Sequence, residues 1–574
     1  MITREQLLAM AAASRQKKLM AAESLQHSTA GVMLAAPTPV SSPENSAPIT
    51  SIVWNEEQQA AIDLARAKKE FCLIGAAGTG KTTTVKQIIK ELLGQMTTLD
   101  GAGNKVVPSS NTIALVSFTN RAVKNIAKAV QGIGAVHHCK TIHTFLRFKP
   151  EKFIILDPIT GNERTTMRFI PTHNRLNPIT ECQLVVVDES SMVDTALFAL
   201  LREATPNARF IFIGDLNQLP PVFGDAILGF KLAELPVIEL TRVYRQAMES
   251  PIIGFQHRYT LPGKLPSDTD MAAMTAASEA AGNGIYFRPL KKYIEDGEVM
   301  AKIFAGYLLT EMDAGKYDPE TGNHVVLVPF NKQFGTIELN KHLATALSKR
   351  RNVETYEIIS GIVKTYLAPG DLVTFNKREW RILSIERNKK YFGKLPRESS
   401  LHLNRFGYYT DGLQHEVNVL DALNAEFNNS EELLRMTVGG REDDEETTNQ
   451  ASHVLLLQSV DSDMTCEAST AGEVNTVQLA YCTTIHKSQG SEWEKVYLIM
   501  TRHHNVMISR ELLYTGMTRA KKDLVVIYSP QSGPGLKDSS IARAVKRQEI
   551  PGIGWKAKVE VFKGKAKKNS GEYE

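Results

Sequence analysis

Residues 71–82 read FCLIGAAGTGKT, a short apolar run followed by a glycine-rich loop that ends in Lys81 and Thr82. The loop fits the pattern G-x-x-x-x-G-K-[S/T], and it lies between an apolar strand and a helical run, as a phosphate-binding loop requires. Glycines let backbone N–H groups approach phosphate oxygens, and the start of the next helix adds partial positive charge. We expect Lys81 to reach the terminal phosphates and Thr82 to ligate Mg²⁺. The alternative is a glycine-rich turn with a chance lysine.

Composition sets broad limits on the rest of the chain. Its 574 residues are 43% apolar and 23% charged, which excludes a coiled coil, a collagen or a wholly disordered chain. With 67 Lys and Arg against 63 Asp and Glu, the net charge of +4 requires any basic surface to be local. The five scattered cysteines favour a reducing compartment, and no apolar run is long enough to cross a membrane. We therefore expect a soluble, cytoplasmic protein, in the host cytoplasm if it is viral.

Two series of short apolar strands alternate with helical stretches, a pattern typical of parallel sheets covered on both faces. The first series is expected at residues 71–74, 113–117, 184–187 and 210–213. The second begins at His324 and resumes at Gln478, Val496 and Leu524.

Composition changes along the chain divide it into expected units. These are a flexible leader (1–50), a first α/β domain (51–255) with a hairpin-like insertion (147–182), a connecting segment (256–322), a second α/β domain (323–355 and 476–536), a β-rich insertion (356–475) that includes an acidic run (442–446), and a basic tail (537–574). The tail carries ten Lys and Arg against five Asp and Glu. It is either a DNA or partner contact or a solvated terminus.

Two adjacent acids follow the apolar run at 184–187. The carboxyl ends of parallel strands meet at one edge of a sheet, so Asp188 and Glu189 are expected beside the phosphate loop. Asp188 would hold Mg²⁺, and Glu189 would polarise an attacking water. A solvated strand end is the alternative for an isolated Asp-Glu pair.

Polar residues after the next strand complete a candidate catalytic set. Gln218, in GDLNQLPP (214–221), is expected to sense the terminal phosphate, although alone it could be an ordinary loop glutamine. Arg245 and Arg519 come from different halves of the chain, as arginine fingers supplied across a cleft would. For either arginine, a surface salt bridge is an equal alternative.

Taken in order, these motifs resemble those of superfamily 1 helicases over roughly residues 54–529. Motif I is the phosphate loop, motif II is Asp188-Glu189, and motif III runs from Gly214 to Gln218. Motif IV matches Tyr244-Arg245, motif V matches 484–492 (TIHKSQGSE), and motif VI matches 514–519 (YTGMTR). The resemblance implies an α/β fold with two RecA-like motor domains and an ATP·Mg²⁺ site between them.

The resemblance also extends the expected nucleotide site beyond the phosphate loop. Gln58 falls on the family's adenine-contacting glutamine. The expected catalytic residues are Lys81, Glu189, Gln218, Arg245 and Arg519. The expected nucleotide contacts are Gln58, Gly75, Ala76, Ala77, Gly78, Thr79, Gly80, Lys81, Thr82, Thr83, Gly490 and Glu492, with Thr82 and Asp188 at the metal.

Within the superfamily, DESSMVD (188–194) and HKSQGSEWEKV (486–496) resemble the RecD/Dda branch more than the UvrD/Rep branch, whose motif II typically reads DEFQD. A Pif-type branch shares some of these phrases, but YTGMTRAKKDLVVI (514–527) is nearer RecD/Dda. That branch implies 5′ to 3′ translocation, a β-hairpin pin in the first motor domain and a small Src-homology-3-like barrel in the second. The insertions at 147–182 and 356–475 fall where those belong.

Residues after two strands of the first domain, and motif V of the second, correspond to the family's single-strand track. The expected DNA contacts are Phe118, Thr119, Asn120, His143, Thr484, His486 and Ser488. Base stacking on Phe118 or Phe145 would suit a reader without sequence preference, although either ring could be core. For His143 and His486 the alternative is a structural histidine.

The sequence thus predicts an ATP-dependent DNA helicase that translocates 5′ to 3′ on single-stranded DNA and unwinds duplex. Its expected partners are single-stranded DNA, forked duplex DNA and replication or recombination proteins. The alternative is an ATPase that displaces bound proteins without processive unwinding. A binding module without activity would require a degraded site, and the catalytic residues are all present.

Overall fold

The computed structural model describes residues 54–570, with gaps at 100–104, 107, 110, 134, 157–162, 244–248, 361–362, 377, 389–401, 404–408, 411–415, 418–449, 461 and 531–538. The expected leader, Tyr244, Arg245 and the acidic run at 442–446 lie outside the described residues. From Asn55 onward the chain forms one compact unit.

The first sheet is six-stranded and entirely parallel, and it carries the phosphate loop. In spatial order its strands are β10 (Val237–Leu240), β1 (Phe71–Gly75), β9 (Arg209–Gly214), β8 (Leu184–Asp188), β4 (Ile113–Ser117) and β5 (Cys139–Thr141). Ser117 pairs with Asp188, so polar strand ends lie together at the carboxyl edge.

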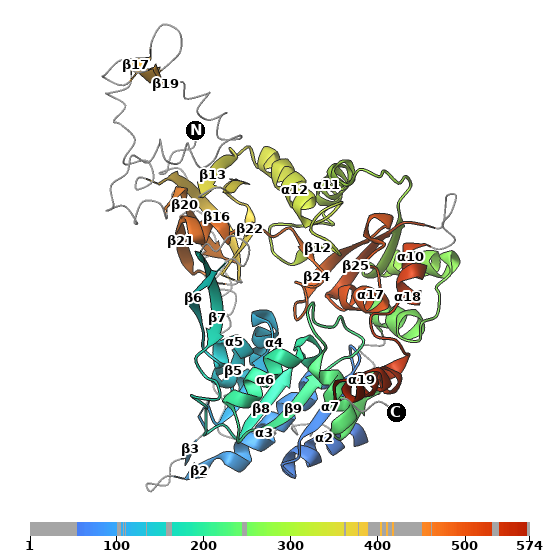
Figure 1. Cartoon of the computed structure of the whole chain (residues 1–574). Helices are drawn as coiled ribbons and strands as arrows, with labels where there is room; N and C mark the ends of the chain where they lie inside the picture. The colour runs from blue at the N-terminus through green and yellow to red at the C-terminus, as the bar shows by residue number, and fades with distance from the viewer. Residues whose placement is uncertain are drawn as a thin grey trace, which may run out of the picture. The chain divides into compact units, whose positions relative to one another are not determined.

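Helices cover both faces of this sheet (Figure 1). Cys72 and Ile74 of β1 pack into one core with Leu201 of α6 and Leu228 of α7. Successive side chains of a strand alternate between faces, so Phe71 and its alternate neighbours, also buried, face the other side. The helices of this half are α2 (Glu56–Arg66), α3 (Lys81–Met96), α4 (Asn120–Val130), α5 (Ile142–Phe145), α6 (Thr195–Ala204) and α7 (Ile227–Glu234).

The second sheet is five-stranded and also parallel. Its strands in spatial order are β11 (Gly284–Pro289), β25 (Ala520–Tyr528), β24 (Trp493–Met500), β12 (His324–Val328) and β23 (Cys482–Thr484). Leu498 contributes to one core and its neighbour Tyr497 to another, so both faces are buried. The covering helices are α9 (Pro251–Phe255), the π-helix η4 (Gln256–Thr260), α10 (Asp268–Ala281), α11 (Gly297–Asp313), α12 (Thr336–Arg351), α17 (Arg510–Met517) and α18 (Ser540–Lys546).

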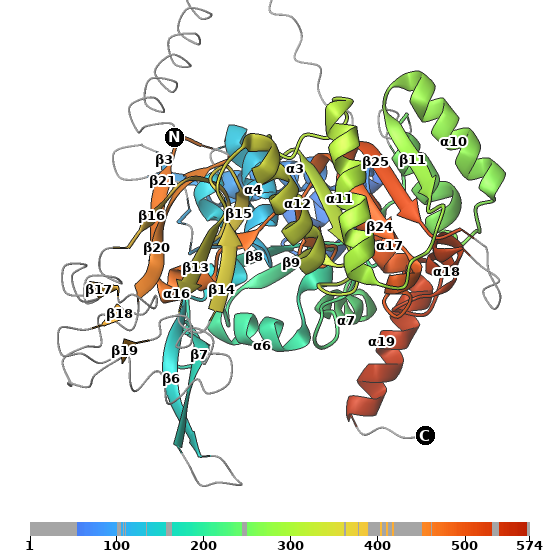
Figure 2. The same ribbon diagram turned by 90° about the horizontal axis from the view of Figure 1, so that it is seen from above.

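Two β insertions interrupt the motor sheets. The antiparallel hairpin of β6 (Phe148–Leu156) and β7 (Glu163–Pro171) projects as a two-stranded ribbon (Figure 2). The second insertion is an antiparallel five-stranded sheet with its own core. Its elements are β15 (Leu372–Phe375), β16 (Arg378–Arg387), β20 (Gln450–Ser459), β21 (Thr465–Thr470), β22 (Gln478–Leu479), the hairpin β13 (Tyr356–Ser360) and β14 (Val363–Leu367), and α16 (Ala471–Asn475). The predicted fold class, with two parallel motor sheets, a hairpin and a β-rich insertion, is confirmed.

Short elements complete the chain: β2 (Thr98–Leu99), β3 (Lys105–Val106), β17 (His402–Leu403), β18 (Tyr409–Thr410), β19 (Glu416–Val417), and the 3-10 turns η1 (Gln131–Ile133), η2 (Val136–His138), η3 (Ser190–Met192) and η6 (Arg502–His504).

The C-terminal segment differs from the expected basic tail. It contains α18 and a longer helix, α19 (Gly554–Ser570), which lies beside α7 (Figure 1). Trp555, Val559 and Phe562 fall on one face of α19, and the last two are buried. This apolar face docks the helix, and the excess of basic residues alone did not reveal it. Among the described residues, helices with the length and apolar character needed to span a bilayer are absent.

Candidate active site

The phosphate loop joins β1 to α3, and glycine sets its geometry. Gly78 and Gly80 have φ angles of 80° and 84°, a left-handed conformation that glycine adopts without strain. A Cβ at Gly75 would lie 2.5 Å from the Thr79 hydroxyl oxygen, so the loop closes too tightly for a side chain there. Gly80 also leaves the start of α3 without a side-chain cap. The first N–H groups of this helix can therefore bind an anion.

The Lys81 ammonium lies inside this loop. Its Nζ donates to the Gly75 carbonyl oxygen at 2.5 Å and to the Ala76 carbonyl oxygen at 3.0 Å. The Thr79 hydroxyl donates to the same Ala76 oxygen at 2.9 Å. A phosphate that binds Lys81 must therefore compete with two backbone carbonyls.

The residues present fit a hydrated Mg²⁺ ion. Thr82 and Thr83 are exposed in the first turn of α3, and Asp188 ends β8 at the same edge of the sheet. Hydroxyl and carboxylate oxygens are the protein ligands that Mg²⁺ prefers. Desolvation raises the pKa of the Asp188 carboxyl group to about 7, the Glu189 charge adds to the rise, and Lys81 opposes it. A cation there would restore the charged form.

Glu189 follows in a strained backbone conformation. Its φ and ψ angles are 50° and 42°, the left-handed region that residues other than glycine rarely occupy. Such strain costs about 1–3 kcal/mol and persists where the surrounding structure imposes it. The turn directs the chain away from β8 immediately after Asp188 and begins η3.

A tyrosine from the second motor half joins the phosphate loop to motif III. The Tyr514 hydroxyl, on α17, donates to the Asp215 carboxylate at 2.7 Å and accepts from the Ala77 N–H at 3.0 Å. Tyr514 is fully buried, and burial and the Asp215 charge raise the pKa of its hydroxyl well above the ordinary value. Both residues lie within the motifs named above, but neither was expected to have a role of its own. Their contact spans 299 positions, so no local signal could have revealed it.

Further bonds connect motif III to the second half. The Leu219 N–H donates to the Thr515 hydroxyl at 2.9 Å, and the Gln489 amide donates to the Leu219 carbonyl at 2.9 Å. Gln218, between these contacts and Asp215, is 6% exposed. Its amide oxygen is buried and has no hydrogen-bond partner among the described residues. An unpartnered buried acceptor calls for a donor, such as a water held near a phosphate.

Arg519 reaches the same cleft from the second half. It is 4% exposed, and its guanidinium donates to the Thr515 and Ser491 carbonyls and to the Thr518 hydroxyl. Burial lowers the pKa of this guanidinium, and Glu189 is the first of several acids that oppose the shift. The structure therefore brings Arg519 into electrostatic range of Glu189. Arg245, the other expected finger, is not among the described residues.

Gln58 lies at the start of α2, where its amide has protein partners. Its side-chain oxygen accepts from the Asn55 N–H at 3.3 Å, and its nitrogen donates to the Thr84 hydroxyl at 3.2 Å. The residue is 2% exposed. It thus braces α2 against the first turns of α3, and the adenine contact stays a prediction.

Motif V packs against the first motor half through Gly490. A Cβ at this residue, whose φ is 73°, would lie 2.7 Å from the Thr119 hydroxyl oxygen. The Asn125 amide of α4 donates to the Gly490 carbonyl at 3.1 Å. Glu492 is exposed and lies 3.6 Å from the Lys521 ammonium. Glycine is required where the two halves approach this closely.

The expected DNA contacts of the first half gather at the carboxyl ends of β4 and β5. Phe118 and His143 are partly exposed, and their rings pack edge to face with centroids 5.9 Å apart. The centroid of the Phe148 ring, at the base of the hairpin, lies 4.9 Å from the centroid of the His143 ring. Thr119 caps α4, which begins at Asn120. A second ring considered for stacking, Phe145, is 3% exposed and belongs to the core.

The expected contacts of the second half are less accessible. Ser488 is 1% exposed and donates to the Ile485 carbonyl at 2.7 Å. Thr484 is buried and accepts from the Lys487 N–H at 3.2 Å. His486 is half-buried, and burial lowers its pKa. In this conformation His486 is the one of the three with a side chain partly open to solvent.

Arg121, which follows the expected DNA contact Asn120, joins three parts of the chain. From α4 its guanidinium lies 2.5 Å from the Glu379 carboxylate of β16 and 4.5 Å from the centre of the Trp493 ring of β24. Glu379 is 258 positions away. The first motor half, the second and the β-rich insertion therefore meet at one side chain.

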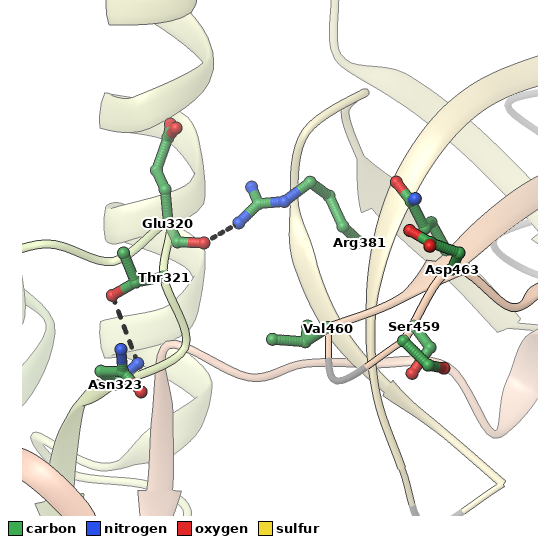
Figure 3. A pocket seen from close by; sticks show the side chains of 9 residues that line it. Glu320, Thr321, Asn323, Arg381, Ser459, Val460 and Asp463 are labelled. Atoms are coloured by element: carbon green, nitrogen blue, oxygen red, sulfur yellow. Dashed lines mark hydrogen bonds between the residues drawn. The ribbon is translucent and has the colours of Figure 1, made fainter. Parts of the chain in front are cut away.

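A separate cavity of about 680 Å³ lies between the loop before β12 and the β-rich insertion (Figure 3). Glu320, Arg381 and Asp463 are among its lining residues, and the Arg381 guanidinium donates to the Glu320 carbonyl. The cavity shares no residue with the motifs. Clusters of three or more His, Cys, Asp or Glu suited to a metal are absent from the part of the chain that the structure describes.

Family models match both motor halves. Residues 58–224 match a model described as an AAA domain, and residues 479–527 match one described as a UvrD-like helicase C-terminal domain. The first match covers the phosphate loop and motifs II and III. The second covers motif V and motif VI.

Curated relatives resemble most of the chain. The ATP-dependent RecD2 DNA helicase of Deinococcus radiodurans is 26% identical over 81% of this chain and 48% of its own length. The RecBCD enzyme subunit RecD of Haemophilus influenzae is 24% identical over 85% of this chain and 70% of its own. The chain thus spans about half of the first relative's length. The crystal structure of Pif1 helicase from Candida albicans aligns with 90% of this chain and 100% of its own at 15% identity, with a TM-score of 0.41.

The two parallel sheets and the two matched models give the chain the fold of a two-domain P-loop NTPase, similar to that of helicases. These relatives and the motifs make the chain similar to superfamily 1 helicases of the RecD and Dda branch, the resemblance that the sequence indicated.

Proposed function

We propose that this protein is an ATP-driven DNA helicase that translocates 5′ to 3′ on single-stranded DNA and unwinds forked duplex. One observation carries the proposal. Tyr514 of the second motor half bonds at once to the phosphate loop, through the Ala77 N–H, and to Asp215 of motif III. A change at the nucleotide site is thereby transmitted directly to the other half of the chain.

In this proposal the first sheet binds the triphosphate. Lys81 exchanges the Gly75 and Ala76 carbonyls for terminal phosphate oxygens, and the uncapped N–H groups of α3 bind the others. Mg²⁺, when held by Thr82 and Asp188, would neutralise part of the phosphate charge. Phosphoryl transfer depends on such positioning and charge stabilisation more than on covalent chemistry.

Hydrolysis needs an oriented water and a cation opposite the developing charge. Glu189 polarises the attacking water, and Gln218 holds it through the amide oxygen that has no partner among the described residues. Arg519 supplies the cation from the second half and lies within range of Glu189. A finger of this kind is worth about 10³–10⁵ in rate.

Stepping follows from two grips on DNA whose spacing depends on the cleft. Phe118 and His143 form the grip on the first half, and His486 belongs to the grip on the second. The close contact of Gly490 with Thr119 joins the two grips. The β6–β7 hairpin is the candidate wedge, and each base-pair step that it opens costs about 1.4 kcal/mol of stacking.

Unwinding of labelled forks with either a 5′ or a 3′ single-stranded tail tests the proposal. We expect ATP-dependent unwinding of the 5′-tailed fork and little of the 3′-tailed fork. Preference for the 3′ tail would refute the polarity. Displacement of streptavidin from biotinylated single strands without unwinding of either fork would support the protein-displacing ATPase instead. Absence of DNA-stimulated ATP hydrolysis would refute both.

A further inference from the structure

The last two helices of the described chain belong to different motor halves. In α18, Ile541 and Val545 lie in the core of the second sheet. In α19, Val559 lies in a core of the first sheet, and the Phe562 ring packs against Phe230 of α7 with centroids 5.2 Å apart. This C-terminal strap, α18 and α19, therefore crosses from one half to the other.

A buried ion pair lies where α19 passes the cleft. Lys558 is 2% exposed, and its ammonium donates to the Glu511 carboxylate of α17 at 2.8 Å. Glu511 is 1% exposed, and its second oxygen accepts from the Glu549 N–H at 2.9 Å. Both partners of this pair are thus removed from solvent and joined to the strap.

The same ammonium also holds motif III. Lys558 Nζ donates to the Leu216 carbonyl at 2.9 Å, and Leu216 follows directly after Asp215. Glu511 lies three residues before Tyr514 on α17, on a neighbouring position of the same helical face. The strap therefore contacts, through one side chain, the two elements whose Asp215–Tyr514 bond links the motor halves.

Stability alone does not account for a pair of this kind. Burying two charges costs solvation free energy that burying an apolar pair does not. A protein in which an apolar pair of the same volume replaces a buried ion pair is therefore often equally stable or more stable. What an apolar pair cannot do is donate to the Leu216 carbonyl. The charged pair thus provides a directed hydrogen bond to the motif III loop that a methionine or leucine would lack.

We propose that Lys558 is a positioning residue for ATP hydrolysis, and that the C-terminal strap holds motif III against α17 during the ATPase cycle. The proposal rests on the proposed function, because it assigns the strap to the same ATPase cycle. Lys558 contacts none of the phosphate-loop residues through the bonds described above, so its loss should lower kcat and leave the KM for ATP nearly unchanged.

The test measures steady-state ATP hydrolysis on oligo-dT by the full chain. The double variant Lys558→Met/Glu511→Met removes both charges, so that neither is left unpaired, and it also removes the bond to Leu216 and the bond from the Glu549 N–H. We expect its kcat to fall by about 10- to 100-fold, the loss of one buried charge-assisted hydrogen bond, with KM changed less than about threefold. Lys563→Met is the matched control, because Lys563 is exposed on α19 and pairs with Glu560.

A folded double variant with wild-type kcat would overturn the inference, as would equal losses of kcat in the Lys563→Met control. If the double variant does not fold, Lys558→Arg replaces it. The longer, planar guanidinium keeps the charge beside Glu511 but not the donor geometry, so kcat should fall again with KM held. A wild-type chain without DNA-stimulated hydrolysis would refute the proposed function itself, which is a different outcome from an active chain that is indifferent to Lys558.

Discussion

The Tyr514 hydroxyl links the second motor half to both the phosphate loop and motif III, and removing it should separate nucleotide binding from turnover. Tyr514→Phe deletes one oxygen from a fully buried side chain. The Ala77 N–H and the Asp215 carboxylate each lose a partner. The lost bond to Ala77 affects the phosphate loop, and the lost bond to Asp215 affects motif III.

The two losses have opposite consequences. A phosphate oxygen that uses the Ala77 N–H has to displace the tyrosine hydroxyl, whose bond at 3.0 Å is worth about 0.5–1.5 kcal/mol. Without it, nucleotide should bind about 2- to 12-fold more tightly. The bond at 2.7 Å to the Asp215 carboxylate involves a charged partner and is worth about 1.5–3 kcal/mol. Its loss loosens motif III, so kcat should fall about 10- to 100-fold.

Titration with a fluorescent ADP analogue measures the first effect, and ATP hydrolysis on oligo-dT measures the second. Tyr497→Phe is the matched control. Tyr497 is equally buried, and its hydroxyl donates to the Glu311 carboxylate at 3.3 Å and to the Lys316 carbonyl at 3.4 Å within the second half. It should change neither quantity. Weaker ADP binding by Tyr514→Phe would refute the competition that we infer at Ala77, and an unchanged kcat would refute the role that we assign to the Asp215 bond.

Three further perturbations test other parts of the structure. Glu189→Gln should abolish ATP turnover while nucleotide stays bound, as nitrocellulose filter binding would show; normal hydrolysis would remove Glu189 from its role as the base. Arg121→Ala and Glu379→Gln should show a coupling energy of about 0.2–1 kcal/mol in a double-mutant cycle of thermal stability, because both side chains are partly exposed, and strict additivity would contradict their contact. Burial lowers the pKa of His504 to about 3, so the unfolded chain, with a histidine pKa of about 6.5, binds a proton that the folded chain does not. Unfolding should become easier by about 1.4 kcal/mol per unit as pH falls from about 6.5 towards 3, and His504→Gln should flatten that slope in melting curves recorded against pH.

Local patterns explain why so much of the motor fold could be predicted. A buried parallel strand is a short apolar run, and the phosphate loop is encoded within residues 75–82. Strand lengths were less certain where charge interrupts the run. The strand expected from Val496 begins at Trp493 and includes Lys495. Lys495 is 9% exposed, and its ammonium lies 5.4 Å from the Tyr497 ring centre, which stabilises the charge inside the strand. A charged residue can continue a buried strand when its charge has a favourable partner.

The C-terminal strap shows a different reason for error. Counting charges over 537–574 indicated a basic tail, but charge counts do not distinguish a solvated lysine from a buried one. The spacing of Trp555, Val559 and Phe562, at i, i+4 and i+7, is the signal that predicts an amphipathic helix there. The partner of Lys558 could not have been derived in the same way, since Leu216 is 342 positions away.

The long-range contacts that sequence reasoning missed have one property in common. Tyr514, Arg121 and Lys558 each join segments hundreds of positions apart. In each case a polar side-chain atom forms a hydrogen bond to a residue of the other motor half or of the β-rich insertion. The phosphate loop, by contrast, can bind phosphate with residues from a single stretch of chain. Binding chemistry is therefore readable from local sequence, whereas coupling between the halves depends on contacts that only the folded chain creates. A motor differs from a nucleotide-binding domain in that second set of contacts, so they are where variants should separate hydrolysis from movement.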